Sequence, residues 1–331
     1  MAAKPTLHSV AERAGVSIAT VSRVINGISS NGATEDRIKK AIKELGYEPN
    51  SAARALKVNA SEQICIALPD LSNPVYQSMI RGVQKGFKVS KYRLMLSTSL
   101  SSTEEVITQI KSLRRNIADG LIINALVADE EVEELLTSLK IPIVIIGSSF
   151  SQLPFDSIQV DSVRGASMAV EYLLQRNRSE ILFLNGPWMT NPAKRRKEGF
   201  LKSMKASGLK NPEKYIANAK AFNPNAAVVA LSEFPNLKKF TAILCANDFL
   251  AAGAIKYLAQ QKIRVPEDVA VIGIDNTDLA PILNPTLTSV DFKAEYRGEL
   301  AAKYLLERLE NPELPPRQVK IEPELVIRES A

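Results

Sequence analysis

From residue 61 onward, short apolar runs alternate with segments of helical periodicity, and this alternation constrains the fold more than any other feature. Strands that are separated by helices pair in parallel and form a sheet with helices on both faces. The expected strands are Gln63–Leu68, Tyr92–Leu96, Gly120–Ile123, Pro142–Ile146, Ser157–Val160, Ile181–Leu184, Thr241–Cys245, Val269–Ile272 and Leu287–Val290. Helices are expected between them, for example over Thr103–Leu113, Val163–Gln175 and Asp248–Gln261. Because the roughly 270 residues of this stretch exceed one comfortable core, the sequence predicts two such lobes.

The composition of the 331-residue chain is that of a globular protein, with 45% hydrophobic and 24% charged residues. No apolar run approaches the ~20 residues that cross a bilayer, and no secretory signal is visible, so we expect a cytoplasmic protein without membrane contact. Cys65 and Cys245 lie inside apolar runs and are expected to be reduced core thiols rather than a disulfide or a metal site. His8 is the only histidine, which disfavours a zinc site or a catalytic triad.

The first sixty residues form a small basic segment before a nearly neutral remainder. They contain nine basic and five acidic side chains and so hold four of the chain's six net positive charges. Such a segment is typical of a polyanion-binding module, although an ordinary solvated surface produces the same excess.

Within this basic segment the apolar spacing predicts three short helices. The first, Leu7–Ala14, begins after Thr6 and ends at Gly15, the second covers Ile18–Asn26, and the third covers Glu35–Leu45. The residues expected to face a shared core are Leu7, Val10, Ala11, Ala14, Val21, Val24, Ile25, Ile38, Ala41, Ile42 and Leu45. Two short helices joined by a tight turn that contains glycine are the helix-turn-helix pattern.

The outward face of the second helix suits the major groove of DNA. Arg23 can bond a guanine edge with two hydrogen bonds, Ile18 can touch a thymine methyl group, and Ser17 and Ser22 offer hydroxyls to phosphates. A solvent-exposed helix in a three-helix bundle explains the same residues, so both interpretations stay open.

The segment Ser51–Lys57 is alanine-rich and too short to be a stable helix alone in water. Leu56 is an apolar side chain without an evident core, and Arg54 and Lys57 flank it. An apolar wedge between basic residues is what insertion into the minor groove requires. A simple interdomain linker is the alternative.

The runs Val10–Ser17 and Thr20–Asn26 resemble the headpiece of the lactose-repressor (LacI/GalR) family of bacterial transcription regulators. Glu44–Asn50 and Ala53–Leu56 continue the resemblance through the family's hinge helix, whereas the loop Ser29–Thr34 is shorter than the family's usual one. The resemblance implies that Ile18, Ala19 and Arg23 read bases and that Leu56 enters the centre of the operator. The full set implied to bind DNA is Thr6, Ser17, Ile18, Ala19, Thr20, Ser22, Arg23, Asn26, Asn50, Ala53, Leu56 and Lys57.

The remainder of the chain resembles the family's effector domain, which has the fold of periplasmic sugar-binding proteins. The matching motifs are Leu71–Pro74, Ala246–Asp248, Ala251–Ala254, Val265–Val269, Gly273–Asn276 and Asn284–Thr288. In open α/β sheets a ligand lies at the carboxyl ends of the strands, where Asn247, Asp248 and Asp275 follow predicted strands. Together with the positions that the resemblance supplies, the expected effector-binding residues are Tyr76, Arg164, Arg196, Phe222, Asn247, Asp248 and Asp275.

Three of these assignments have structural alternatives. Asp248 can serve only to cap the helix that follows it, Tyr76 can be a core residue, and Arg164 can lie on an exposed helix surface. If Arg164 and Arg196 both face the cleft, the effector is expected to carry a negative charge such as phosphate or carboxylate.

The resemblance implies an all-α helix-turn-helix headpiece at residues 1–50, a hinge helix or linker at 51–60, and a two-lobed α/β effector-binding and dimerisation domain at 61–331. Its N-lobe is expected at about 61–161 and 290–320, and its C-lobe at about 162–289 and 321–331. We therefore expect a homodimeric repressor that binds a pseudo-palindromic operator in double-stranded DNA under control of a carbohydrate-like effector.

Two other classes of protein remain as alternatives. A sugar-binding protein without a regulatory role would explain the two lobes but not residues 1–60. An enzyme is disfavoured because the sequence shows no phosphate loop, metal-ligand spacing or nucleophile elbow, so neither a cofactor nor a metal is expected.

Overall fold

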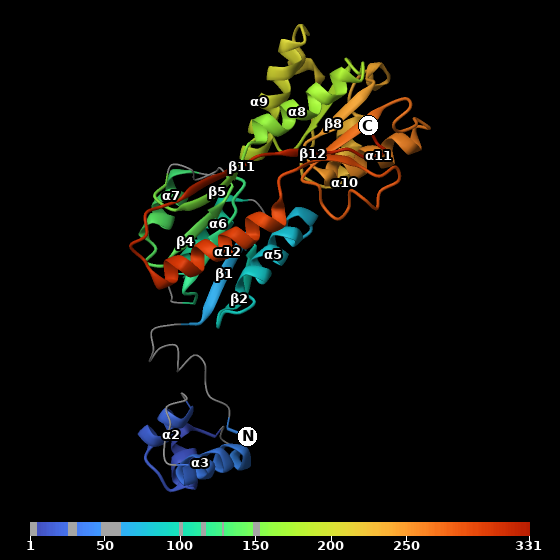
Figure 1. Cartoon of the computed structure of the whole chain (residues 1–331). Coiled ribbons are helices and arrows are strands. Elements are labelled where there is room, and N and C mark those ends of the chain that lie inside the picture. The colour runs from blue at the N-terminus through green and yellow to red at the C-terminus, as the bar shows by residue number, and fades with distance from the viewer. Residues whose placement is uncertain are drawn as a thin grey trace. The chain divides into compact units, whose positions relative to one another are not determined.

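The computed structural model describes residues 5–25, 32–47, 61–98, 102–113, 117–127, 129–147 and 153–331 (Figure 1). The chain divides into two compact units, Met1–Ser61 and Glu62–Ala331, which we call the headpiece and the body. The predicted hinge segment, with Asn50, Ala53, Leu56 and Lys57, lies outside the described residues, and so does Asn26.

The headpiece consists of α1 (Leu7–Ala14), α2 (Ile18–Ile25) and α3 (Gly32–Leu45). The predicted apolar residues of all three helices form its core, joined by Tyr47. Thr6 caps α1, since its hydroxyl accepts a hydrogen bond from the backbone N–H of Ser9, and Gly15 ends it in the left-handed conformation at φ 64°. The predicted start of the third helix was wrong by three residues, because the first turn of α3 contributes no side chain to the core and so adds nothing to the apolar spacing.

The N-lobe of the body is built on a six-stranded sheet in the order β11-β5-β4-β3-β1-β2, in which all neighbours are parallel. Its strands are β1 (Gln63–Leu68), β2 (Arg93–Thr98), β3 (Gly120–Ile123), β4 (Ile143–Ile146), β5 (Asp156–Val160) and β11 (Gln318–Ile321). Its helices are α5 (Pro74–Phe87), α6 (Thr103–Leu113), α7 (Glu130–Ser138) and α12 (Ala294–Glu310).

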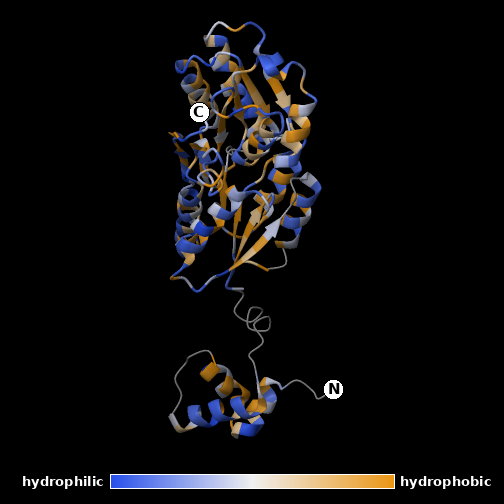
Figure 2. Cartoon of the chain, turned by 90° about the vertical axis from the view of Figure 1, so that its right-hand side faces the viewer, coloured by the Kyte–Doolittle hydropathy of each residue, from blue (hydrophilic) through white to orange (hydrophobic). Residues whose placement is uncertain are grey.

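Successive residues along β1 face opposite sides of this sheet, as the period of two in a strand requires. Ile64 and Ile66 pack in the cluster that contains α5 and α12, whereas Cys65 and Ala67 pack in the cluster that contains α6 and α7. Because both faces are covered, the strand reads as a continuous apolar run. Figure 2 shows hydrophobic residues concentrated on the strands of the body.

The C-lobe contains a second six-stranded sheet in the order β12-β10-β9-β8-β6-β7, in which only β12 is antiparallel to its neighbour. Its strands are β6 (Ile181–Asn185), β7 (Ile216–Asn218), β8 (Ala242–Cys245), β9 (Ala270–Ile274), β10 (Thr288–Asp291) and β12 (Glu324–Val326). Its helices are α8 (Ser162–Gln175), α9 (Asn191–Ala206), α10 (Pro224–Ser232) and α11 (Asp248–Gln260), with the short 3₁₀ helices Pro212–Tyr215 and Leu237–Lys239.

The predicted fold class is confirmed: a helical headpiece is followed by a two-lobed α/β body with two parallel-rich sheets. The chain passes between the two lobes after β5, after β10 and after β11. Three strands were not anticipated, namely β7, β11 and β12. All three lie at sheet edges, where polar residues interrupt the apolar run that marks a central strand.

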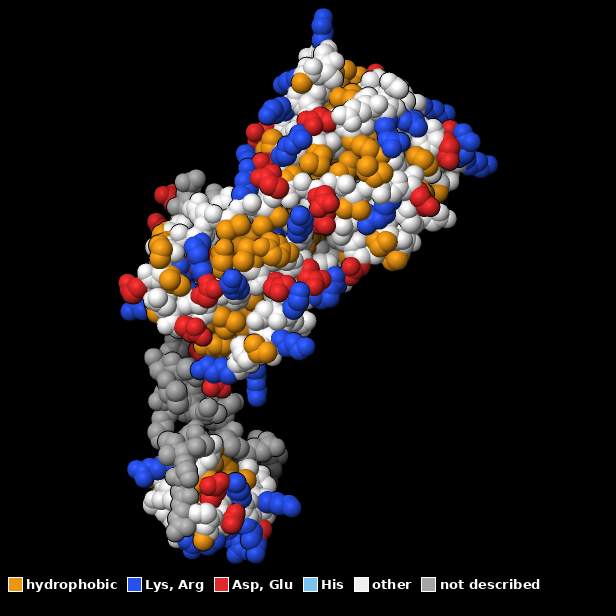
Figure 3. Space-filling view, in the orientation of Figure 1, with side chains coloured by type: hydrophobic (Ala, Val, Ile, Leu, Met, Phe, Trp, Pro, Cys, Tyr) orange, Lys and Arg blue, Asp and Glu red, His pale blue; other side chains and the backbone are white. Residues whose placement is uncertain are grey.

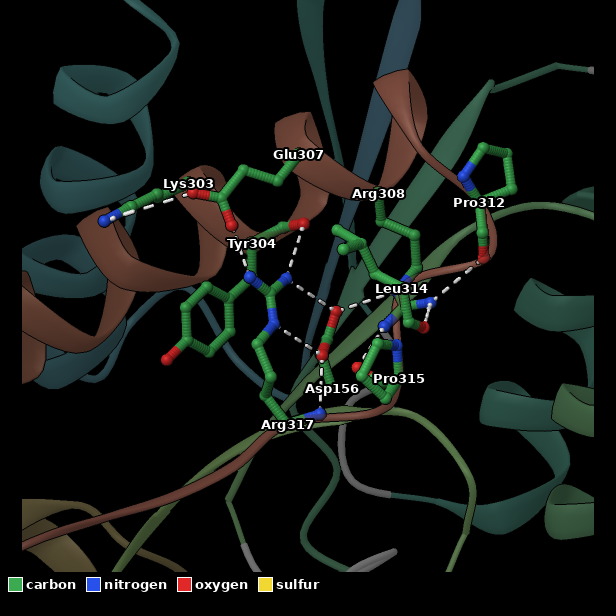
Figure 4. A network of polar contacts seen from close by, with 9 residues as sticks. All are labelled: Asp156, Lys303, Tyr304, Glu307, Arg308, Pro312, Leu314, Pro315 and Arg317. Atoms are coloured by element: carbon green, nitrogen blue, oxygen red, sulfur yellow. Dashed lines mark hydrogen bonds and ion pairs between the residues drawn. The ribbon is translucent and has the colours of Figure 1, made fainter.

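Asp156 joins three elements of the N-lobe (Figure 4). Its buried carboxylate accepts hydrogen bonds from Nε of Arg308 on α12 at 2.8 Å and from Nε of Arg317, just before β11, at 3.1 Å. Burial opposes the ionisation of Asp156, but the hydrogen bonds from Arg317 and Arg308 outweigh it and lower the pKa of the carboxyl. The network therefore holds the start of β11 against β5 and α12.

Candidate functional site

A cavity lies between the two lobes of the body, at the carboxyl ends of strands from both sheets. Its polar lining includes the side-chain amides of Asn73, Asn124, Asn191 and Asn247. Five of the seven sequence-predicted effector residues line it, namely Tyr76, Arg196, Phe222, Asn247 and Asp275. Amide and carboxylate groups at fixed positions are suited to hydrogen-bond the hydroxyls of a small ligand.

Arg196 and Asp275 form an ion pair in this cavity. Nη2 of Arg196, on α9, lies 3.0 Å from Oδ1 of Asp275, which directly follows β9, and both side chains are less than a tenth exposed. Nη1 of Arg196 donates to the carbonyl of Ala246, whereas its buried Nε has no partner in the described structure. Burial raises the pKa of Asp275, although Arg196 and Arg297 oppose the shift.

The backbone also fixes Asp275 firmly. Its φ is 105°, a conformation that residues other than glycine rarely adopt, and its N–H donates to the carbonyl of Val290 at 2.8 Å. The side chain is therefore held at the end of β9 by both its backbone and its ion pair with Arg196.

Asn247 and Asp248 have different roles although they are adjacent. Asn247 lines the cavity and caps α11, since its Oδ1 accepts the N–H of Leu250 at 2.8 Å. The alternative that Asp248 caps this helix is therefore wrong. Asp248 lies behind the cavity lining, where its carboxylate accepts bonds from the N–H and hydroxyl of Thr277 and from the hydroxyl of Ser289. Burial, with a contribution from Asp275, raises the pKa of Asp248 to about 7.

Two aromatic residues among the predicted set reach the cavity from opposite lobes. Phe222 follows β7, and its ring lies against Gly186, where a Cβ would be 2.1 Å from the Cε1 of the ring. Glycine at position 186 therefore leaves the space that the ring occupies. Tyr76 on α5 is only 6% exposed, and burial, aided by Asp275, raises its pKa. Both rings offer an apolar surface to a bound ligand.

Arg164 does not lie among the residues that line the cavity. It is on α8 and is about half exposed, and its Nη1 pairs with Glu171 on the same helix at 2.8 Å. The arrangement matches the surface alternative for Arg164, so an effector charge cannot be argued from this residue.

Sequence reasoning missed several residues of the cavity, of which Asn73, Asn124, Phe292 and Arg297 matter most here. Asn73 and Asn124 follow β1 and β3, so their positions after apolar runs were an available signal. Arg297 lies inside the long helix α12, and no local pattern distinguishes a helix residue that faces a cavity from one that faces water.

The headpiece presents the predicted DNA-binding face of α2 to solvent. Ser17, Ile18, Ala19 and Arg23 are exposed, and Ile18 has 47% of its surface exposed although it is apolar. The hydroxyl of Ser17 accepts the N–H of Thr20 at 3.1 Å, so it caps the helix. Thr20 and Ser22 are half-buried, and Thr6, also exposed, caps α1.

The charge of the described headpiece suits a polyanion. Neither α1 nor α2 has an acidic residue in its first turn, which leaves their positive N-terminal ends uncompensated. The basic side chains of the described headpiece are all exposed, as Figure 3 illustrates for one face, and they are Arg13, Arg23, Arg37, Lys39, Lys40 and Lys43.

Two kinds of site are not found in the described part of the chain. No group of three or more His, Cys, Asp or Glu side chains there is arranged to hold a metal ion. Among the described helices, none combines the length and the hydropathy that a membrane span needs. Cys65 and Cys245 are both free and buried.

Comparison with known proteins identifies both parts of the chain. Residues 6–50 match the family described as bacterial regulatory proteins, lacI family, and residues 170–331 match a periplasmic binding protein-like domain. The chain is 31% identical to the ribose operon repressor of Escherichia coli over 329 aligned residues. The alignment covers 98% of this chain and 99% of that protein. The chain belongs to the lacI family of bacterial regulatory proteins.

Solved structures of the family cover both halves of this lacI-family chain. The lac repressor dimer bound to operator and the anti-inducer ONPF has a TM-score of 0.84 at 26% identity and covers 99% of each chain. A complex of the transcriptional regulator CelR with cellobiose has a TM-score of 0.75 at 27% identity and covers 99% of this chain and 100% of that one. The chain is accordingly a DNA-binding transcriptional regulator that responds to a small effector, and not an enzyme.

Proposed function

We propose that this lacI-family regulator is a cytoplasmic homodimeric repressor whose operator affinity depends on a carbohydrate-like effector in the interlobe cavity. The observation that carries the proposal is that one chain combines a helix-turn-helix whose second helix is exposed with a buried polar cavity. The cytoplasm is proposed because bacterial operators are located there.

The exposed side chains of α2 support sequence-specific binding. Arg23 can donate two hydrogen bonds to a guanine, while Ile18 and Ala19 have no side-chain donors and can only read shape and thymine methyl groups. We propose that Thr6, Ser17, Thr20 and Ser22 position the helix on the phosphate backbone. The proposed DNA contacts of Asn26, Asn50, Ala53, Leu56 and Lys57 rest on the sequence resemblance alone.

We propose a homodimer because two-fold symmetry suits helix-turn-helix recognition of DNA. Two copies related by a two-fold axis present two copies of α2 to half-sites about one helical turn apart, and their operator is then pseudo-palindromic. The lac repressor that matches this chain is a dimer on its operator, which supports the same assembly here.

The cavity lining supports a carbohydrate-like effector. Asn73, Asn124 and Asn247 supply amide donors and acceptors for hydroxyl groups, and Phe222 supplies a ring on which the apolar face of a sugar can stack. Because the cavity is lined from both lobes, a bound effector can favour one arrangement of the lobes over another. It changes DNA affinity only to the extent that it binds these arrangements unequally.

Selection from a pool of randomised DNA duplexes tests the proposal. The full chain should enrich a two-fold symmetric motif that survives competitor DNA, and a sugar that binds the chain should change the amount retained. Uniform binding that is lost with rising salt would contradict the repressor and leave a ligand-binding protein with a basic segment.

A further inference from the structure

Arg297 is a buried arginine at the interlobe cavity whose charge the described protein does not neutralise. It lies in the first turns of α12 and lines the cavity, yet only 5% of its surface is exposed. Its Nε is buried without a hydrogen-bond partner. In the described residues, no hydrogen bond or ion pair reaches any part of its guanidinium group.

The nearby acidic groups are already engaged by other partners. Asp275 pairs with Arg196, and Asp248 accepts three hydrogen bonds from Thr277 and Ser289. Asp291 accepts bonds from the side chain of Asn276 and from the backbone N–H of Lys293. Asp275 and Asp291 attract Arg297 through space but form no contact with it.

Among the described residues that line the cavity, the charged side chains are therefore two arginines and one aspartate. Arg196 and Asp275 balance each other, and Arg297 leaves one positive charge in excess. Burial lowers the pKa of Arg297, which reflects the cost of holding a charge away from water. A guanidinium at this position is destabilising unless something else binds it.

The packing of α12 against α5 fixes where Arg297 lies. The neighbouring Gly298 lies so close to α5 that a Cβ there would be 2.1 Å from the carbonyl oxygen of Met79. In the opposite direction, a Cβ on Gly82 of α5 would be 1.9 Å from the carbonyl oxygen of Glu295. The two helices are in backbone contact on both sides of Arg297, so its Cα has little freedom to move toward water.

We infer that the effector of this regulator carries an anionic group, a phosphate or a carboxylate, and that Arg297 binds that group. The planar guanidinium can form two parallel hydrogen bonds to either anion. The asparagine amides and the ring of Phe222 then bind the uncharged, hydroxylated remainder of the molecule. This inference rests on the proposed function of the cavity as the effector site.

Calorimetry on the full chain with matched pairs of ligands tests the inference. The pairs are glucose with glucose 6-phosphate and with gluconate, and ribose with ribose 5-phosphate, while inorganic phosphate alone serves as a minimal probe. We expect at least one anionic member to bind about tenfold or more tightly than its neutral partner. Comparison of the sugar phosphates with gluconate shows whether the site binds a phosphate or a carboxylate.

Arg297→Met removes the charge at nearly constant volume and should reduce the preference for the anion to about twofold or less. Lys303→Met is the matched control, because Lys303 is on the same helix, carries the same charge and is mostly exposed. It should leave the preference unchanged. Arg297→Met should also raise the Tm of the ligand-free chain, since it removes a buried charge without a partner.

The inference is overturned if, in every pair, the neutral member binds as tightly as its anionic partner. It is also overturned by a preference that survives Arg297→Met, a lower Tm of that variant, or the absence of any Arg297-dependent binding of the anionic probes. The selection of DNA duplexes described under the proposed function distinguishes failure of this inference from failure of the proposed function. If the chain selects an operator but shows no anion preference, only this inference fails, whereas loss of DNA selectivity removes the proposed function itself.

Discussion

Replacement of Asp156 by Asn should destabilise the body more than any surface substitution. The carboxylate accepts four hydrogen bonds of 2.8–3.1 Å, one from Arg308 and three from Arg317, and the aspartate is fully buried. Removing one partner of a buried ion pair costs roughly 3–5 kcal/mol, because the remaining charge loses its counter-ion.

The lower end of that range applies here. In the variant Arg308 keeps its hydrogen bonds to the carbonyls of Pro312, Leu314 and Pro315. Arg317 keeps its hydrogen bonds to the carboxylate of Glu307 and to the carbonyl of Tyr304 (Figure 4). We therefore expect Asp156→Asn to lower the free energy of unfolding by about 3 kcal/mol.

Urea denaturation of the full chain, followed by circular dichroism, measures this change. The control is Glu198→Gln, which breaks a pair between half-exposed side chains, Arg195 and Glu198, and should cost less than about 1 kcal/mol. A cost for Asp156→Asn as small as that of the control would refute the conclusion that this network holds β11 in place.

The same network predicts a pH dependence. The pKa of Asp156 is lower in the folded chain than its ordinary value of 3.8, so its contribution is fully present above that value and is lost as the pH falls through the folded pKa. The difference in stability between the wild type and Asp156→Asn should therefore shrink below about pH 4. A difference that stays constant through the acid range would show that the carboxylate is not the group that matters.

Three further predictions concern the headpiece, the packing of the N-lobe and the cavity. Arg23→Ala should relax the base preference at one symmetric operator position, by about 1–3 kcal/mol in a binding-site selection, and unchanged preference would argue against base reading by Arg23. Gly82→Ala should lower the stability of the body by about 2 kcal/mol or more in urea denaturation, because its Cβ meets the backbone of Glu295, and a neutral result would mean that α5 and α12 separate easily. Phe222→Ala should weaken the binding of a stacked sugar about tenfold in calorimetry, and equal affinity would exclude stacking on this ring.

The sequence by itself determined the helical headpiece and the central strands of the body. Helices α1 and α2 follow from apolar spacing together with the caps at Thr6 and Gly15, which act within a few residues of one another. Central strands such as β1 and β8 are covered on both faces and therefore read as apolar runs. Positions such as Asn247 and Asp275 were predictable because they come within two residues of the ends of such strands.

Only the tertiary structure decided which charged side chains are buried together. Arg196 meets Asp275 across 79 residues of sequence, and Arg164, equally basic, pairs with Glu171 at the surface instead. The close contact of α5 with α12 turns Arg297 toward the cavity without a counter-ion in the described chain. The spacing of apolar residues in the sequence shows where a helix forms and which of its residues share a face. The elements that pack against the helix decide which of its residues face the cavity.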